Sequence, residues 1–319
     1  MPAELVLFAT IATAIVIEAA PFLLLGCMLS ALFEHFAPAE GLEGMLPRSA
    51  LGQVAAGCFA GVILPTCECG VVPVVRRFLA KGVPPRTALA FMLAAPVANP
   101  VVLASTWVAF RGDLSMVLGR LACVLVPAIL LGAHFGKRPA RSLLRNGLDL
   151  DLAMGSTTGH GAGCGCGCGD GPKPKGLAAV RSILSGAGTE FLHMGAFLIA
   201  GSLAAAAIKT FLPPAWLAAA AASPLLAIPA MMLLAVLLSV CSEADAFVAA
   251  SFVTFPAAAQ LAFIGLGPML DLKLIPLYLA VFNTKLAKAL LWFPALAVLL
   301  VCLLFHILFS SGGMPGVLP

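Results

Sequence analysis

Apolar residues form long, nearly uninterrupted runs along this chain, and polar residues gather between them. Long apolar runs cover residues 5–33, 87–110, 114–135, 183–211 and 286–309. At 1.5 Å per residue, a helix over each run is long enough to cross the ~30 Å hydrocarbon core of a bilayer. The pattern therefore predicts an all-α membrane protein that crosses the bilayer several times.

Two pairs of segments resemble each other. Residues 21–38 match residues 196–213 at a shift of 175 positions, and residues 89–99 match residues 261–271 at a shift of 172. Two independent matches at nearly the same shift indicate an internal duplication, so we expect two repeated half-bundles of transmembrane helices. The predicted domains are a first transmembrane repeat, a linker and a second transmembrane repeat, over residues 1–136, 137–180 and 181–319.

Each half has two short apolar pieces after its first long run. They cover about residues 51–65 and 66–80 in the first half, and 224–240 and 241–255 in the second. A helix of ~15 residues covers only ~22 Å, so each pair is either one broken span or a re-entrant hairpin. Two full spans follow, which gives about 8–10 spans in all. Four crossings per half would make parallel repeats and five would make inverted ones, and the sequence leaves both open.

The composition agrees with lipid as the main solvent, because 61% of the residues are hydrophobic and only 10% are charged. Residues 1–10 contain no basic residue, so we expect the first run to be a retained span rather than a signal peptide. Lys and Arg gather at residues 76–86 and in the linker, which predicts that both segments face the cytosol. A net charge of +4 gives no reason to expect a nucleic-acid partner.

The first interruption carries two thiols and a carboxylate, Cys67, Glu68 and Cys69, between Pro65 and Gly70. Interrupted helices at matching places in two repeats are the best sequence indication of a transport site. Two cysteines one residue apart in non-helical backbone can direct both sulfurs at one thiophilic species, such as Cu(I), Zn(II) or As(III). We therefore predict that these three residues line the transport site and that the two thiols bind metal.

The second interruption carries Cys241, Ser242, Glu243 and Asp245. Charged side chains are costly at membrane depth, so we predict that these residues belong to the same transport site, with Cys241 as a third metal ligand. The alternative is that this segment ends at the membrane surface and both carboxylates are solvated. Cysteines isolated in smooth apolar runs are expected to serve only in packing; these are Cys27, Cys58, Cys123 and Cys302.

Other polar residues lie at matching depths of the two repeats. The shift of 175 positions places His193 opposite Glu18, and this pair could form either a proton relay or a structural hydrogen bond. The shift of 172 positions matches Asn99, which lies beside Pro100, with Asp271, which follows Pro268. Proline breaks helices, so we predict that these two polar residues line the transport path. Lys285 and Lys288 are expected to extend to the membrane surface.

The linker alternates glycine and cysteine, with Cys164, Cys166 and Cys168 after His160. Glycine leaves the backbone free to fold three thiolates and an imidazole around one Cu(I) or Zn(II) ion, so we predict a cytosolic metal-capture segment. A simple flexible tether is the alternative. No tightly bound cofactor is expected.

Motifs for other chemistry are missing from the sequence. There is no Gly-x4-Gly-Lys-Ser/Thr phosphate loop, so the chain is not expected to be its own ATPase. There is also no His-Glu-x2-His or Gly-x-Ser-x-Gly element for hydrolysis, and we do not expect an enzyme.

Three segments of the first half, residues 65–73, 76–84 and 95–100, together with residues 241–249, resemble motifs of the ArsP-type permease family. The resemblance covers nearly the whole chain and implies a multi-pass permease of the bacterial inner membrane. Some members of the family export trivalent organoarsenicals. The Gly/Cys-rich linker is similar to a branch described as copper/zinc efflux permeases, and it departs from the simpler arsenical members.

Taken together, these features lead us to expect a secondary-type permease that exports a soft metal or metalloid. Export of trivalent organoarsenicals is the alternative substrate. A membrane thiol-redox enzyme using Cys67 and Cys69, and a metal sensor without transport, are alternatives of other classes. The expected partners are the lipid bilayer and the transported ion or thiophilic molecule, and a homo-oligomer is possible.

Overall fold

The computed structural model describes residues 3–36, 46–64, 66–145, 177–211 and 224–311. Within these residues the chain forms twelve α-helices and one short 3-10 helix, and no β-strand. The prediction of an all-α membrane protein is therefore confirmed.

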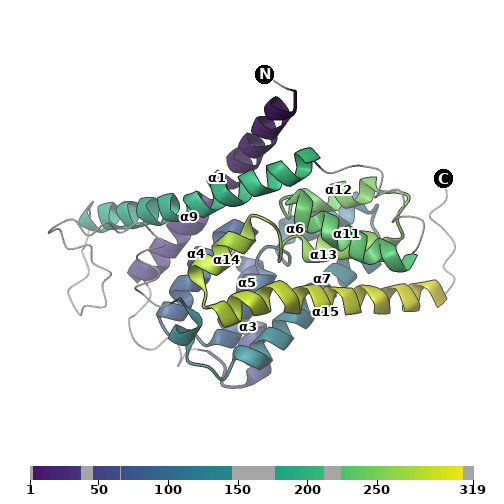
Figure 1. Cartoon of the computed structure of the whole chain (residues 1–319). Coiled ribbons are helices and arrows are strands. Elements are labelled where there is room, and N and C mark those ends of the chain that lie inside the picture. Colours follow the sequence, from purple (N-terminus) through teal and green to yellow (C-terminus); the bar gives the residue numbers. More distant parts are fainter. Residues whose placement is uncertain (1–2, 37–45, 65, 146–176, 212–223, 312–319) are drawn as a thin grey trace.

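In the described part of the chain, four helices are long and apolar enough to cross a membrane. They are α1 (Ala3–Phe36), α7 (Leu114–Phe135), α9 (Leu177–Phe211) and α15 (Thr284–Ser311). Many of their large apolar side chains are exposed, as expected of helices that face lipid. Figure 1 shows α1 and α9 crossing on one side of the molecule, with α15 on the opposite side.

The predicted interruptions are present in both halves. In the first half, α3 (Ala50–Ile63) ends before the cysteine motif and α4 (Glu68–Ala80) begins within it. In the second half, α11 (Pro224–Leu238) ends before Cys241 and α12 (Asp245–Ser251) begins after it.

The prediction of one continuous span over residues 87–110 is wrong. This segment forms two helices, α5 (Pro85–Ala94) and α6 (Pro100–Ala109), separated by a turn. Pro100 has no backbone N–H and disfavours helical backbone at Asn99, which explains why the first helix does not continue. The second half is broken at the matching place, between α13 (Ala257–Leu266) and α14 (Leu274–Val281).

Within the described residues, each half therefore contains six α-helices in the same order: one long, four short and one long. Helices α5 and α13 have 10 residues each and begin at Pro85 and Ala257, 172 positions apart. The turn before the next helix is also repeated, because the Asn99 side chain accepts a hydrogen bond from the amide of Val102 and Asp271 accepts one from the amide of Leu274. The described helices thus follow the duplicated pattern of the sequence, whereas the exact domain boundaries stay a prediction.

The short helices bring the two halves together. Helix α4 contacts α14 of the other half, and its counterpart α12 contacts α6. The closing helices α7 and α15 also contact each other, as do the opening helices α1 and α9. A 3-10 helix, η1 (Ala140–Leu143), lies at the start of the predicted linker and packs against α4. The two interruptions consequently lie where the halves meet.

Candidate functional site: a buried ion-pair cluster at the two helix interruptions

Helix α4 begins inside the first cysteine motif because Cys67 caps it. The backbone of Cys67 is extended (φ −74°, ψ 170°), and its sulfur accepts a hydrogen bond from the amide of Gly70 at 3.4 Å. Gly70 lies directly against Gly26 of α1, where a side chain on either residue would overlap the backbone of the other helix. Glu68 lies in the first turn of α4, two residues before this close approach of the two helices, and is 1% exposed.

The second interruption has a comparable geometry. After α11 the backbone of Ser239 takes a positive φ of 48°, which ends the helix. The carbonyl of Cys241 then accepts hydrogen bonds from the amides of Ala244 and Asp245, just as the carbonyl of Cys67 accepts one from Val71. Both cysteines therefore lie at the point where a new helix starts.

Glu68 joins the two interruptions. Its carboxylate accepts hydrogen bonds from the Cys241 thiol at 3.5 Å and from the Ser242 hydroxyl at 3.3 Å. It also lies 3.1 Å from the ammonium nitrogen of Lys273, which precedes α14. All these donors belong to the second half of the chain, so a single buried carboxylate connects the repeats.

Lys273 is shared between two carboxylates. Its nitrogen lies 3.3 Å from Oδ2 of Asp271. Oδ1 of Asp271 accepts a hydrogen bond from the amide of Leu274, the first residue of α14. Lys273 is 3% exposed, and a methyl group added at Gly201 of α9 would lie 2.8 Å from its Cα, so the backbones are in close contact. Glu68, Asp271 and Lys273 carry two negative charges and one positive charge when all are ionised. The cluster then carries a net charge of −1, and an uncompensated buried charge is costly.

A second buried ion pair lies beside the first. Arg120 of α7 is fully buried and donates to Asp245 Oδ2 at 2.7 Å, to Thr106 Oγ1 at 2.7 Å and to the carbonyl of Ser242 at 3.2 Å. Ser242 thus contacts Arg120 through its backbone and Glu68 through its hydroxyl. The other oxygen of Asp245 is buried and makes no hydrogen bond within the described part of the chain.

The predicted thiol ligands are all buried here. Cys67 and Cys69 are 3% and 2% exposed, and Cys241 is 5% exposed. Among the described residues, no group of three or more His, Cys, Asp or Glu side chains has a geometry that could hold a metal ion. Metal binding by these cysteines stays a prediction.

The other predicted site residues have different surroundings. Glu243 is partly exposed and accepts a hydrogen bond from Ser242. The Asn99 side chain caps α6, as described above. No hydrogen bond joins it to Glu68 in the described part of the chain. Glu18 is exposed on α1 and His193 is partly exposed on α9, and no hydrogen bond or ion pair joins these two residues in the described part of the chain. The proton relay also stays a prediction.

Unlike Glu18, the carboxylate of Glu190, one helical turn before His193 on α9, is buried. Glu190 is 3% exposed and lies 2.8 Å from Arg77 and 3.4 Å from Arg76, both on α4, and it also accepts a hydrogen bond from Ser30 of α1. This cluster fastens α1, α4 and α9 to one another.

Three charged residues of these clusters are absent from the sequence-based prediction: Arg120, Glu190 and Lys273. Arg120 was visible as the one charged residue within the apolar run 114–135. Glu190 lies 172 positions after Glu18, at the shift that relates the later repeat motifs. The predicted metal ligands of the linker, His160, Cys164, Cys166 and Cys168, lie outside the described residues.

Helices interrupted at matching places in two repeats, with charged side chains buried at the interruptions, are typical of membrane transport proteins. The chain belongs to the ArsP_1 family of predicted permeases, whose profile matches residues 4–307. Membership of this family supports a transport function, and a transporter rather than an enzyme.

Two relatives extend over nearly the whole chain. A protein of Streptococcus mutans, named as a proposed two-component membrane permease complex subunit, is 34% identical over 97% of this chain and 98% of its own. The UPF0718 protein YcgR of Bacillus subtilis is 34% identical over 89% of this chain and 92% of its own. No solved structure matches the chain at a significant level.

Proposed function

We propose that this permease exports a thiophilic metal or metalloid species from the cytosol across the bacterial inner membrane, by secondary transport, and that the species crosses at the junction of the two helix interruptions. The observation that carries the proposal is the contact between Glu68 and Cys241, at 3.5 Å. It supports the proposal because it joins the cysteine-containing interruptions of both repeats at one buried carboxylate, which Cys67 and Cys69 flank in the sequence. Soft ions prefer thiolate over hydroxyl and carboxylate ligands.

Lys273 would stabilise the buried carboxylates of the site when no substrate is bound. Its ammonium lies between Glu68 and Asp271 and neutralises one of the two negative charges. An arriving cation would take over these carboxylate contacts and release the lysine. Movement of one half against the other, which is how repeat-built transporters expose a central site to alternate sides, would then break the contacts across the junction.

The adjacent thiols of Cys67 and Cys69 favour one alternative substrate. A trivalent organoarsenical with two hydroxyl groups, R–As(OH)2, can exchange both for sulfur and release two water molecules. Such a species needs two neighbouring thiols, and Cys67 and Cys69 are separated by one residue at the start of α4. The same pair would be the reactive group of the thiol-redox alternative, which predicts no net movement of arsenic or metal.

The linker has an expected role in capture. His160, Cys164, Cys166 and Cys168 would bind the ion in the cytosol and raise its local concentration at the entrance. Deleting residues 159–171 should then weaken resistance at low metal concentration and leave transport intact at high concentration. Loss of transport at every concentration would instead make the linker part of the path.

Uptake into inverted membrane vesicles tests the proposal, with Cu(I), Zn(II) and methylarsenite offered separately. The double variant Cys67→Ser/Cys69→Ser should abolish uptake of the transported species at an unchanged protein level in the membrane. Cys58→Ser, which alters a partly buried thiol of α3 away from the junction, is the matched control and should be silent. Full uptake by the double variant would refute the assignment of the site.

The same variants should be compared for resistance in whole cells. One relative is named as a subunit of a two-component complex, so this chain could also require a second subunit that vesicles made from the overproduced chain would lack. Resistance in cells together with inactive vesicles would indicate such a subunit. Inactivity in both would count against export of these species.

A further inference from the structure

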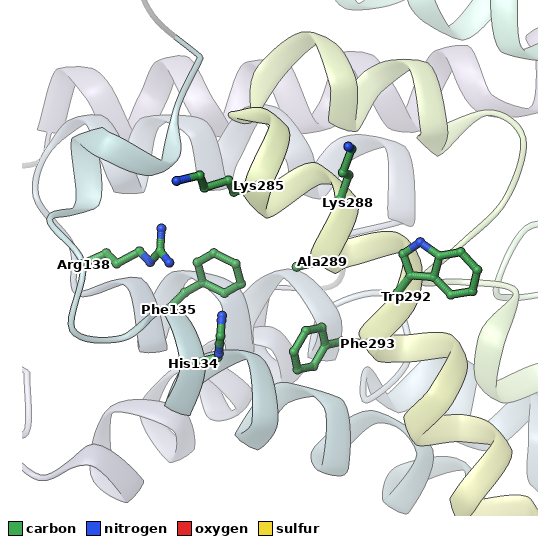
Figure 2. Close-up of a pocket in the computed structure, with 8 residues that line it drawn as sticks. All are labelled: His134, Phe135, Arg138, Lys285, Lys288, Ala289, Trp292 and Phe293. Atoms are coloured by element: carbon green, nitrogen blue, oxygen red, sulfur yellow. The ribbon is translucent and has the colours of Figure 1, made fainter.

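A basic pocket lies away from the junction, between the end of α7 and the start of α15. It is an open cavity of about 380 Å3. Figure 2 shows the side chains that line it. They are His134, Phe135, Arg138, Lys285, Lys288, Ala289, Trp292 and Phe293.

The charges of this pocket are all of one sign. Arg138, Lys285 and Lys288 are exposed cations, and no carboxylate is among the lining residues that the structure describes. In Figure 2, the Lys285 side chain extends from α15 toward the side of the pocket where Arg138 lies. Cations gathered in a concave site with apolar walls raise the local concentration of anions. The pocket therefore suits an anionic group.

Aromatic rings hold the polar groups in place. The Arg138 guanidinium lies 5.1 Å from the centre of the Phe135 ring, and the centre of the His134 ring lies 5.5 Å from that of Phe293. Trp292 is 68% exposed at the rim. Tryptophan is enriched where a membrane protein crosses from headgroups to acyl chains, so its position indicates the depth of the membrane surface.

The pocket is also on the side of the protein that carries the basic segment after α7. The backbone of Leu143 accepts a hydrogen bond from the amide of Asn283, just before α15, and Arg145 donates to the carbonyl of Leu279. The end of α7, the basic segment 137–145 and the start of α15 are therefore held together. By the charge rule for loops, this side faces the cytosol.

An apolar stripe continues from the pocket along α15. Leu296, Leu300 and Leu304 follow Trp292 at intervals of four residues, and all three are exposed. Residues four apart lie on one face of a helix, so the stripe runs from the pocket toward the middle of the bilayer. A ligand that occupied both features would have an anionic head and an apolar tail.

From these features we propose that the pocket binds the phosphate headgroup of an anionic phospholipid of the cytosolic leaflet, with an acyl chain along the stripe of α15. A free phosphate ion would use the cations but not the stripe, which is why we commit to the lipid. Basic pockets between membrane helices on this side are suited to phospholipid headgroups. Because α7 closes the first half and α15 closes the second, the lipid would contact both repeats.

Native mass spectrometry of the purified full chain tests this proposal, with phosphatidylglycerol added against a background of phosphatidylcholine. Lys285→Gln/Lys288→Gln should reduce retention of phosphatidylglycerol about 30-fold, because each lysine near anionic lipid strengthens binding about fivefold. Arg48→Gln/Lys137→Gln, which removes two exposed cations that do not line the pocket, should leave retention unchanged. Lys285→Arg/Lys288→Arg should also retain the lipid and excludes a folding defect as the cause.

Two results would overturn the proposal. Equal retention of phosphatidylglycerol by the glutamine variant and its control would show that the pocket does not select the lipid. Displacement of the lipid by an equal concentration of inorganic phosphate or glycerol phosphate would show a site for free anions. Neither result depends on what the permease transports.

Discussion

The ammonium of Lys273 in the second half lies 3.1 Å from the carboxylate of Glu68 in the first half, although 205 residues separate them along the chain. Both side chains are 3% exposed or less. Each residue lies at the start of a short helix, Glu68 as the first residue of α4 and Lys273 just before α14. The central contact between the repeats is thus electrostatic, in a protein whose other contacts are mainly apolar.

Replacing Lys273 by methionine should destabilise the protein strongly. Lys273→Met leaves Glu68 and Asp271 buried without a cation, and breaking a buried ion pair from one side costs about 3–5 kcal/mol. The double variant Glu68→Gln/Lys273→Met should be more stable than the single variant, because one of the two uncompensated charges is removed. Thermal unfolding of the purified protein in detergent measures both effects.

The control for this experiment is Lys137→Met, which removes an exposed lysine. It should change the free energy of unfolding by no more than about 0.5 kcal/mol. A Lys273→Met protein that unfolds at the same temperature as this control would mean that the ion pair is not formed.

Arg120 should not be replaceable by lysine. Its guanidinium donates to Thr106, Asp245 and the carbonyl of Ser242 at once, and a lysine ammonium on a flexible chain lacks this fork of donors. Arg120→Lys should therefore lower the free energy of unfolding by about 1–3 kcal/mol through unsatisfied buried partners. Arg120→Met should cost more, about 3–5 kcal/mol, because Asp245 is left unpaired.

Thermal unfolding measures these losses, and Arg120→Met/Asp245→Asn should recover part of the stability. Equal unfolding temperatures for the wild-type protein and Arg120→Lys would contradict the three-donor geometry.

The sequence predicted the helices and the interruptions better than the partners of the charged residues. Apolar runs and helix-breaking residues are local features, so the breaks near Cys67 and Cys241 could be found by pattern. The break at Asn99 was missed because the apolar run 87–110 continues through it, although Pro96 and Pro100 were signals of a turn. Which residues pair is a different question, since Lys273 and Glu68 are brought together only by the fold.

The burial of Glu18 and Glu190 was also not predictable from the sequence. Each is a carboxylate within a long apolar helix, yet Glu18 is exposed and Glu190 is buried against α4. A helix that is apolar on all sides has no hydrophobic stripe from which its buried face can be recognised. The prediction from sequence therefore named Glu18 as a site residue and did not include Glu190.

Two glycines at matching places of the repeats should resist substitution. An alanine methyl at Gly26 would overlap the backbone of Gly70, and one at Gly201 would lie 2.8 Å from Lys273 Cα. Gly26→Ala and Gly201→Ala should each force α1 or α9 away from the site, lower the unfolding temperature and reduce transport. Gly195→Ala on α9 is the matched control, because nothing in the described structure lies within 4 Å of its added methyl group.

The control should be neutral or more stable by up to ~1 kcal/mol, since alanine favours helix more than glycine does. Transport and unfolding temperature measured together decide the outcome. If Gly26→Ala behaved like Gly195→Ala, the close approach of α1 to α4 would be refuted.

Glu190 and Glu18 should respond differently to the same substitution. Glu190→Gln removes the anion between Arg76 and Arg77, and we expect a loss of about 1–3 kcal/mol because the two arginines are only partly exposed. Glu18→Gln should not lower the stability, because this side chain is exposed and makes no hydrogen bond or ion pair in the described part of the chain. Unfolding temperature measures both effects, and the pH dependence of vesicle uptake tests the relay separately. An altered pH dependence in Glu18→Gln and His193→Gln, at an unchanged unfolding temperature, would support the relay. Unaltered uptake in both variants would refute it.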